Sequence, residues 1–127
     1  MKLANKEIES VSKLEPFERY QYTVKKIADW ERLFIAINDD NSFLLLKVES
    51  ISVISIWPAK EYALATFDKI GEKKVKEFSL NDFYKMIPYI KQHNILINVF
   101  SVDQNTGFVV AINEFIEDLN SELEKYS

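Results

Sequence analysis

The sequence contains no cysteine, and among its 127 residues it has only one histidine, two glycines and three prolines. Without cysteine there can be no disulfide, no thiolate zinc ligand and no cysteine nucleophile. The two glycines, Gly71 and Gly107, lie far apart, so no glycine-rich loop can bring several backbone amides to a phosphate. These absences exclude the common motifs of thiol enzymes and nucleotide-dependent enzymes.

Candidates for metal or acid–base chemistry are equally few. A zinc site at the single histidine, His93, would have to take its other ligands from carboxylates, which is uncommon. The run "NDDN" at 38–41 offers oxygen ligands, but it lacks the glycine and the bidentate glutamate of a calcium-binding EF-hand loop and is typical of a turn. We expect no metal, no cofactor and no enzymatic activity, and an enzyme with an unfamiliar site ranks last among the alternatives.

The sequence also offers little to a membrane or a nucleic acid. No stretch approaches the roughly 18 apolar residues of a membrane-spanning helix, and the N-terminal "MKLANKEIESVSKLE" lacks the apolar core of a secretory signal. The densest basic stretch, "EKKVK" at 72–76, is far from the concentrated basic face that phosphate binding requires. We therefore expect a cytoplasmic protein, a monomer or homodimer, with no nucleic acid or membrane partner.

What the sequence does have is ample apolar material for one core. Hydrophobic residues make up 47% of the chain and aromatic residues 13%, and this length suits one domain. We expect a single domain over residues 1–127, with the N-terminal helix of residues 1–15 at its periphery.

The periodicity of apolar residues predicts an α+β domain with a mixed, mainly antiparallel sheet of about five to six strands and helices packed on it. The expected order is ααβββαβαββα. Helical spacing places Phe17, Tyr20, Val24 and Ile27 on one buried stripe. The expected strands are 33–37, 43–49, 51–57, 73–78, 95–100 and 108–112.

The stretch "SVISIWPAKEYALATF" joins a strand to a helix. The strand "ISVISIW" is apolar on both faces, which predicts a central position with both faces covered. Pro58 suits the first turn of the following helix, where its missing N–H has no cost. In that helix Ala63 and Phe67 are expected to point inward, and Gly71 is placed for a C-terminal cap.

Aromatic residues around this corner form the first candidate binding site. Trp57 ends the strand, and Tyr62, Arg19, Tyr20 and Trp30 lie on flanking elements. Aromatic rings with a polar edge line binding sites, but they also close cores. We favour core closure for Trp57, with a ligand pocket as the alternative.

Acidic residues of the last helix form the second candidate site. The whole net charge of −4 falls in this helix, because the rest of the chain sums to zero. Asn113 is expected to cap it, and Glu114, Glu117, Asp118 and Glu122 give it a negative face. Such a face is usually only solvated, but it can also steer a basic partner.

A set of short motifs adds a family resemblance. They are "RY" at 19–20, "ADWE" at 28–31, "WP" with "YA" at 57–63, and "DL" and "EL" in the last helix. With these motifs the chain resembles, from about Phe17 to Tyr126, the bacterial "domain of unknown function 2750" family. The resemblance implies the fold but no activity, cofactor or catalytic residue. Phe34 stands where this family often has tryptophan, and "DDNS" where it commonly has a glycine, which weakens the idea of a shared aromatic ligand cage.

Two hypotheses of different classes follow. The first is a non-catalytic protein-interaction module acting through the acidic helix, for example an immunity-like protein that covers the basic active site of a toxin. The second is a small-molecule sensor or carrier with a pocket near Trp57, Tyr62 and Arg19. An indole that meets a cavity would favour the second, and an enclosed indole would favour packing.

Overall fold

The computed structural model describes residues 5–67, 74–102 and 105–126, and its elements follow the predicted order ααβββαβαββα. The helices are α1 (Asn5–Ser12), α2 (Pro16–Trp30), α3 (Lys60–Phe67), α4 (Leu80–Gln92) and α5 (Ile112–Leu123), followed by the short 3-10 helix η1 (Glu124–Tyr126). The strands are β1 (Arg32–Ile37), β2 (Leu45–Val48), β3 (Ile51–Trp57), β4 (Lys74–Ser79), β5 (Leu96–Val99) and β6 (Phe108–Val110). The predicted α+β class is confirmed.

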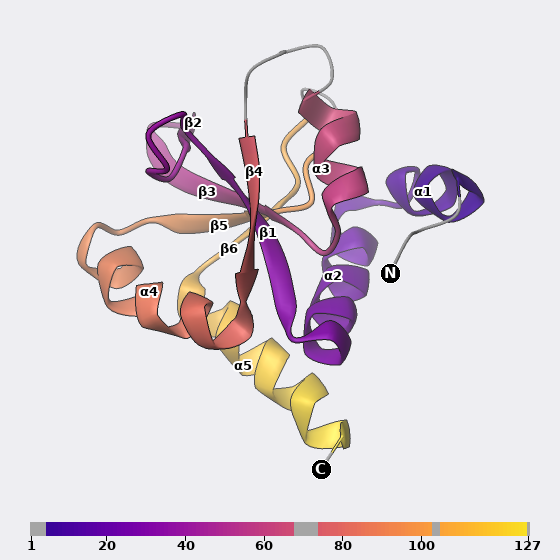
Figure 1. Ribbon diagram of the computed structural model, residues 1–127. Coiled ribbons are helices and arrows are strands. Elements are labelled where there is room, and N and C mark those ends of the chain that lie inside the picture. The colour runs from indigo at the N-terminus through magenta and orange to yellow at the C-terminus, as the bar shows by residue number, and fades with distance from the viewer. Residues whose placement is uncertain (1–4, 68–73, 103–104, 127) are drawn as a thin grey trace.

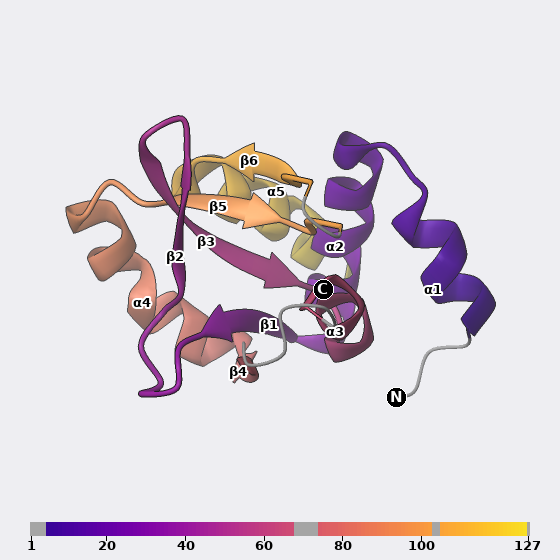
Figure 2. The ribbon, with the colours of Figure 1, turned by 90° about the horizontal axis from the view of Figure 1, so that it is seen from above.

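The strands form one open, mixed sheet in the order β4-β1-β3-β5-β6, with β2 paired to β3 outside this path. Only the β3–β5 pair is parallel among the pairs of the described strands. β2 pairs with the first half of β3, where Val48 faces Ile51, and β1 pairs with its end, where Phe34 faces Trp57. β3 is therefore the central strand that the sequence predicts (Figure 2).

Helices cover both faces of this sheet. α2, α4 and α5 lie on one side, and α3 lies on the other (Figure 1). Because successive side chains of a strand point to opposite faces, Ile54 and Ile56 face the three-helix side, and Ser55 and Trp57 face the α3 side. All four are buried, which explains why this strand is apolar on both faces.

The N-terminal helix α1 lies at the outside of the molecule (Figure 2), and Val11 is its one buried residue. None of the helices in the described part of the chain combines the length and the apolar character needed to cross a membrane.

Local differences from the sequence expectations concern helix ends. The last helix, α5, begins at Ile112, and its N-cap is Ala111, which makes no side-chain capping bond. The predicted cap at Asn113 is wrong, because Ile112 is drawn into the core and the helix begins two residues earlier than a cap at Asn113 would allow. The cap predicted at Gly71 lies outside the described residues. The structure describes Phe67 only as the last residue of the α3 backbone, so the inward position of its side chain stays a prediction.

Candidate functional site

The indole of Trp57, the centre of the first candidate site, is enclosed. Its side chain is 0% exposed, and its Nε1–H donates to the backbone oxygen of Ser101 at 3.1 Å. Tyr62, on α3, is also buried, with its ring centroid 4.6 Å from that of Phe100. A buried N–H that meets a carbonyl is the arrangement of a core residue, so the geometry favours packing over a pocket wall.

Arg19 is also buried, at 6% exposure. Its Nε donates to the backbone oxygen of Phe100 at 3.1 Å, its Nη1 donates to the backbone oxygen of Leu14, and its guanidinium lies 5.7 Å from the centroid of the Phe100 ring. Burial lowers the pKa of this guanidinium, while the charge of Glu15 acts in the opposite direction. Because two of its donors bond backbone carbonyls, Arg19 ties α2 to the end of β5 and to the α1–α2 turn.

A pair of tyrosines fastens α1 to the domain. The hydroxyl of Tyr22 donates to the Glu7 carboxylate at 2.7 Å and lies 2.9 Å from the hydroxyl of Tyr62. The pKa of Tyr22 is raised by burial first, then by its hydrogen bonds with Tyr62 and Glu7. This network gives both tyrosines a structural role between α1, α2 and α3.

Trp30 lies half-buried at the end of α2, apart from the other aromatic candidates. Lys26 Nζ lies 5.1 Å from the Trp30 ring centroid, and the Arg32 guanidinium lies 5.7 Å from it. Arg32 in turn contacts Glu77 at 3.4 Å. The contacts of these two cations with the Trp30 ring, and the ion pair of Arg32 with Glu77, connect the end of α2 to the edge of the sheet.

The structure therefore does not bring the five aromatic-site candidates into one cluster. Arg19 and Tyr62 meet at Phe100, and Trp57 bonds the residue that follows it. The hydroxyl of Tyr20 instead donates to Oδ2 of Asp118 on α5, at 2.5 Å. This bond joins a residue of the first candidate site to one of the second, across 98 positions of sequence.

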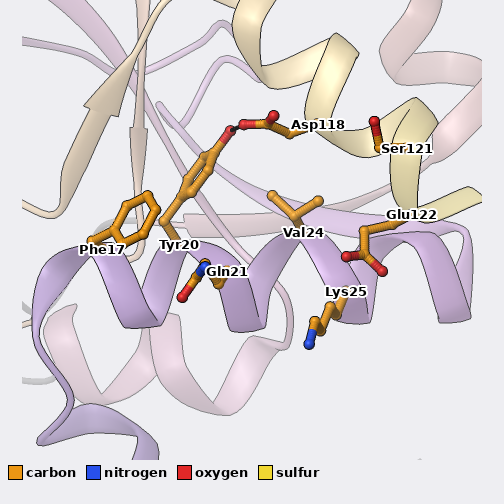
Figure 3. Close-up of a pocket in the computed structure, with 8 residues that line it drawn as sticks. All are labelled: Phe17, Tyr20, Gln21, Val24, Lys25, Asp118, Ser121 and Glu122. Atoms are coloured by element: carbon orange, nitrogen blue, oxygen red, sulfur yellow. Dashed lines mark hydrogen bonds between the residues drawn. The ribbon is translucent and has the colours of Figure 1, made fainter.

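Beside this bond lies a surface groove of about 210 Å³ between α2 and α5. The α2–α5 groove is lined by Phe17, Tyr20, Gln21, Val24, Lys25, Asp118, Ser121 and Glu122 (Figure 3). Its apolar lining comes from α2, and its carboxylates come from α5. The groove thus combines an apolar strip with a negative rim.

The acidic residues predicted for the second site lie along α5, the helix that forms this rim. Glu114, Glu117 and Asp118 are exposed and take part in no ion pair within the described residues. Glu122 is only 18% exposed at its side chain and pairs with Lys125 at 3.1 Å. The opposite face of α5 is buried through Ile112, Phe115 and Leu119, so the helix divides cleanly into a core face and a charged face.

These charges act on Tyr20. Burial raises the pKa of the Tyr20 phenol, and the hydrogen bond to Asp118 and the charges of Asp118 and Glu114 raise it further. A phenolate at this position would face the Asp118 carboxylate directly, with little water to screen it. The phenol therefore stays protonated and keeps donating to Asp118 well above the ordinary tyrosine pKa of 10.0.

This raised pKa predicts a pH dependence of stability. Below pH 10 the Tyr20 phenol is protonated in both states, and above it the unfolded chain loses the proton while the folded chain keeps it. The contribution of Tyr20 to the free energy of unfolding then falls by about 1.4 kcal/mol per pH unit. Urea unfolding of the wild type and of Tyr20→Phe measures this directly. The difference in stability between them should shrink by about 1.4 kcal/mol from pH 9 to pH 11, and a constant difference would contradict the assignment.

Two further candidates from the sequence are a metal site and the single histidine, and both can be compared with the part of the chain that the structure describes. No group of three or more histidine, aspartate or glutamate side chains there is arranged to hold a metal ion. His93 is exposed at the end of α4, and its ring centroid lies 4.4 Å from that of Tyr89.

One residue of the groove departs from the sequence expectation. The helical stripe predicts a buried Phe17, but its side chain is 52% exposed. Phe17 lies in the first turn of α2, where its ring stacks on Tyr20 at 6.2 Å and meets the edge of Phe108 at 5.3 Å. The spacing predicts the correct helix face. Whether another element covers the far side of the Phe17 ring depends on tertiary packing, and among the described residues none does.

The fold and the site define a small α+β domain with an acidic helix packed beside an aromatic-lined groove. The model of the family described as "Protein of unknown function (DUF2750)" matches residues 20–119. The chain belongs to this family, which confirms the resemblance drawn from its motifs. A comparison with curated proteins found no match.

Proposed function

We propose that this protein is a non-catalytic interaction module that binds a positively charged protein partner through the outer face of α5. The single observation that carries the proposal is the set of exposed carboxylates at Glu114, Glu117 and Asp118, which no lysine or arginine of the described residues neutralises. Carboxylates that form no ion pair within their own protein can attract a partner of opposite charge and fix its orientation.

The position of these carboxylates adds support. α5 is held by its buried face and by the bond between Tyr20 and Asp118, so its charges are presented from a fixed helix. A rigid charged surface loses little conformational freedom when it binds. The absence of cysteine suits a reducing compartment, and the proposal places the interaction in the cytoplasm.

Charge reversal tests this proposal. Wild-type protein and the triple variant Glu117→Lys, Asp118→Lys, Glu122→Lys are used to capture partners from cell extract, and bound proteins are quantified by mass spectrometry. We expect recovery of a basic partner to fall about tenfold or more in the variant, since like charges across an interface cost several kcal/mol.

A matched control carries the same change in net charge elsewhere. Asp29→Lys, Asp39→Lys and Glu49→Lys alter three exposed acids that do not line the groove. This control should recover the partner as the wild type does, and circular dichroism should show both variants folded. Equal recovery by the wild type and the α5 variant would overturn the proposal.

A further inference from the structure

The size of the α2–α5 groove limits what it can hold. Its volume of about 210 Å³ lies below the roughly 300–1,000 Å³ of pockets that enclose drug-sized small molecules. It equals several water volumes, at ~30 Å³ each, which is room for one large side chain. The groove is thus better matched to an anchor residue of a protein segment than to a whole metabolite.

The groove offers such an anchor an apolar surface. Phe17, at one end, is 52% exposed and supplies most of the apolar surface, while Tyr20 and Val24, which continue the strip along α2, are each only 3% exposed and form its floor (Figure 3). Phe108 supports the strip from behind, with its ring centroid 4.8 Å from that of Tyr20. Binding hot spots are commonly aromatic side chains in well-packed surroundings, and the Phe17 ring rests on Tyr20 and Phe108 in this way.

The rim of the groove defines the charge of the occupant. Asp118 and Glu122 line the α5 side, and Glu114 precedes Asp118 by one helical turn on the same side. The Tyr20 hydroxyl donates to Oδ2 of Asp118, whereas Oδ1 accepts no hydrogen bond from a donor within the described residues. Among the residues that the structure describes, Lys25 is the one cation that lines the groove. The charges are therefore complementary to basic residues that flank the anchor on the α5 side.

We propose that the α2–α5 groove recognises a short protein segment that combines one large apolar side chain with lysine or arginine residues nearby. The apolar side chain packs on the exposed ring of Phe17, above the floor formed by Tyr20 and Val24, and the basic residues meet Asp118 and Glu114. This inference rests on the proposed function, because it specifies the part of the basic partner that the acidic helix receives.

A selection with a displayed library of random twelve-residue peptides tests the inference. We expect the enriched peptides to carry a Trp, Phe, Leu or Met with at least two Lys or Arg within about four residues of it, the span of one helical turn. A synthetic peptide of the enriched sequence is then titrated by fluorescence polarisation. Phe17→Ala and Asp118→Asn should each weaken its binding about tenfold.

The control for Phe17 is Leu64→Ala on α3, which truncates a side chain of similar exposure, 46%, away from the groove. It should leave the dissociation constant within about twofold, and thermal melts should show all three variants folded. Enriched peptides without basic residues, or binding that survives both groove variants, would overturn the inference.

The two experiments together separate the inference from the proposed function. If no peptide is enriched while charge reversal of α5 still abolishes partner capture, the segment inference fails and the proposed function stands. If peptides bind the groove but charge reversal leaves capture unchanged, the proposed function fails.

Discussion

Trp57→Ala is expected to remove about 3–5 kcal/mol from the free energy of unfolding. The indole at the end of the central strand is fully buried, so its removal leaves a large cavity that the packed core around it cannot close. The backbone oxygen of Ser101 also loses the N–H that it accepts at 3.1 Å. Urea unfolding followed by circular dichroism measures the effect.

Two further variants separate the causes. Trp57→Phe keeps an aromatic ring but removes the donor to Ser101, and should cost about 1–3 kcal/mol. Trp30→Ala truncates the half-buried indole at the end of α2 and should cost less than Trp57→Ala. The result that would contradict this account is a free energy of unfolding for Trp57→Ala within about 1 kcal/mol of the wild type, close to the effect of a surface change. The indole would then not close the core, and the pocket hypothesis would be favoured.

Gly107→Ala is expected to destabilise the fold by about 2–4 kcal/mol, from overpacking and a disturbed hydrogen bond. A Cβ at this position would lie 2.1 Å from the backbone oxygen of Val99 and 2.7 Å from the backbone carbon of Phe100. These neighbours are backbone atoms, so the segment before β6 must move. That movement disturbs the bond from the Gly107 N–H to Oδ1 of Asn98, now 2.9 Å.

Gly107→Ala should also affect the α2–α5 groove. Phe108 follows Gly107 directly, and its ring supports Tyr20 and Phe17. We therefore expect Gly107→Ala to weaken binding in the α2–α5 groove as well as stability. Thr106→Ala, at the exposed neighbouring position, should change stability by no more than about 0.5 kcal/mol. Similar stabilities for the two variants would show that the close approach to Val99 is not required.

The order of elements could be predicted because each element carries its own pattern. Alternation and helical spacing depend on local geometry, and "ISVISIW" shows a doubly covered strand directly. The mixed sheet also follows, since some strands are adjacent in sequence and others are separated by helices. The place of Trp57 at the corner between a strand and a helix suits both packing and a pocket wall, and the sequence favours packing because large aromatic side chains close cores.

The relation between the two candidate sites could not be predicted in the same way. Tyr20 and Asp118 are 98 positions apart, and their bond depends on how α2 packs against α5. The exposure of Phe17 also depends on which tertiary neighbours reach it, and periodicity contains no such information. The early start of α5 at Ile112 is a case where burial of an apolar side chain outweighs a preferred capping residue.

Mapping the bound surface by NMR tests the central claim most directly. The ¹⁵N-labelled protein is titrated with the basic partner recovered by capture, and backbone amide and indole N–H signals are followed together. The account predicts shifts concentrated in α5 and in the first half of α2, with the indole N–H of Trp57 unchanged in its bond to Ser101. Shifts concentrated around Trp57 and Tyr62, with the amides of α5 unmoved, would contradict it.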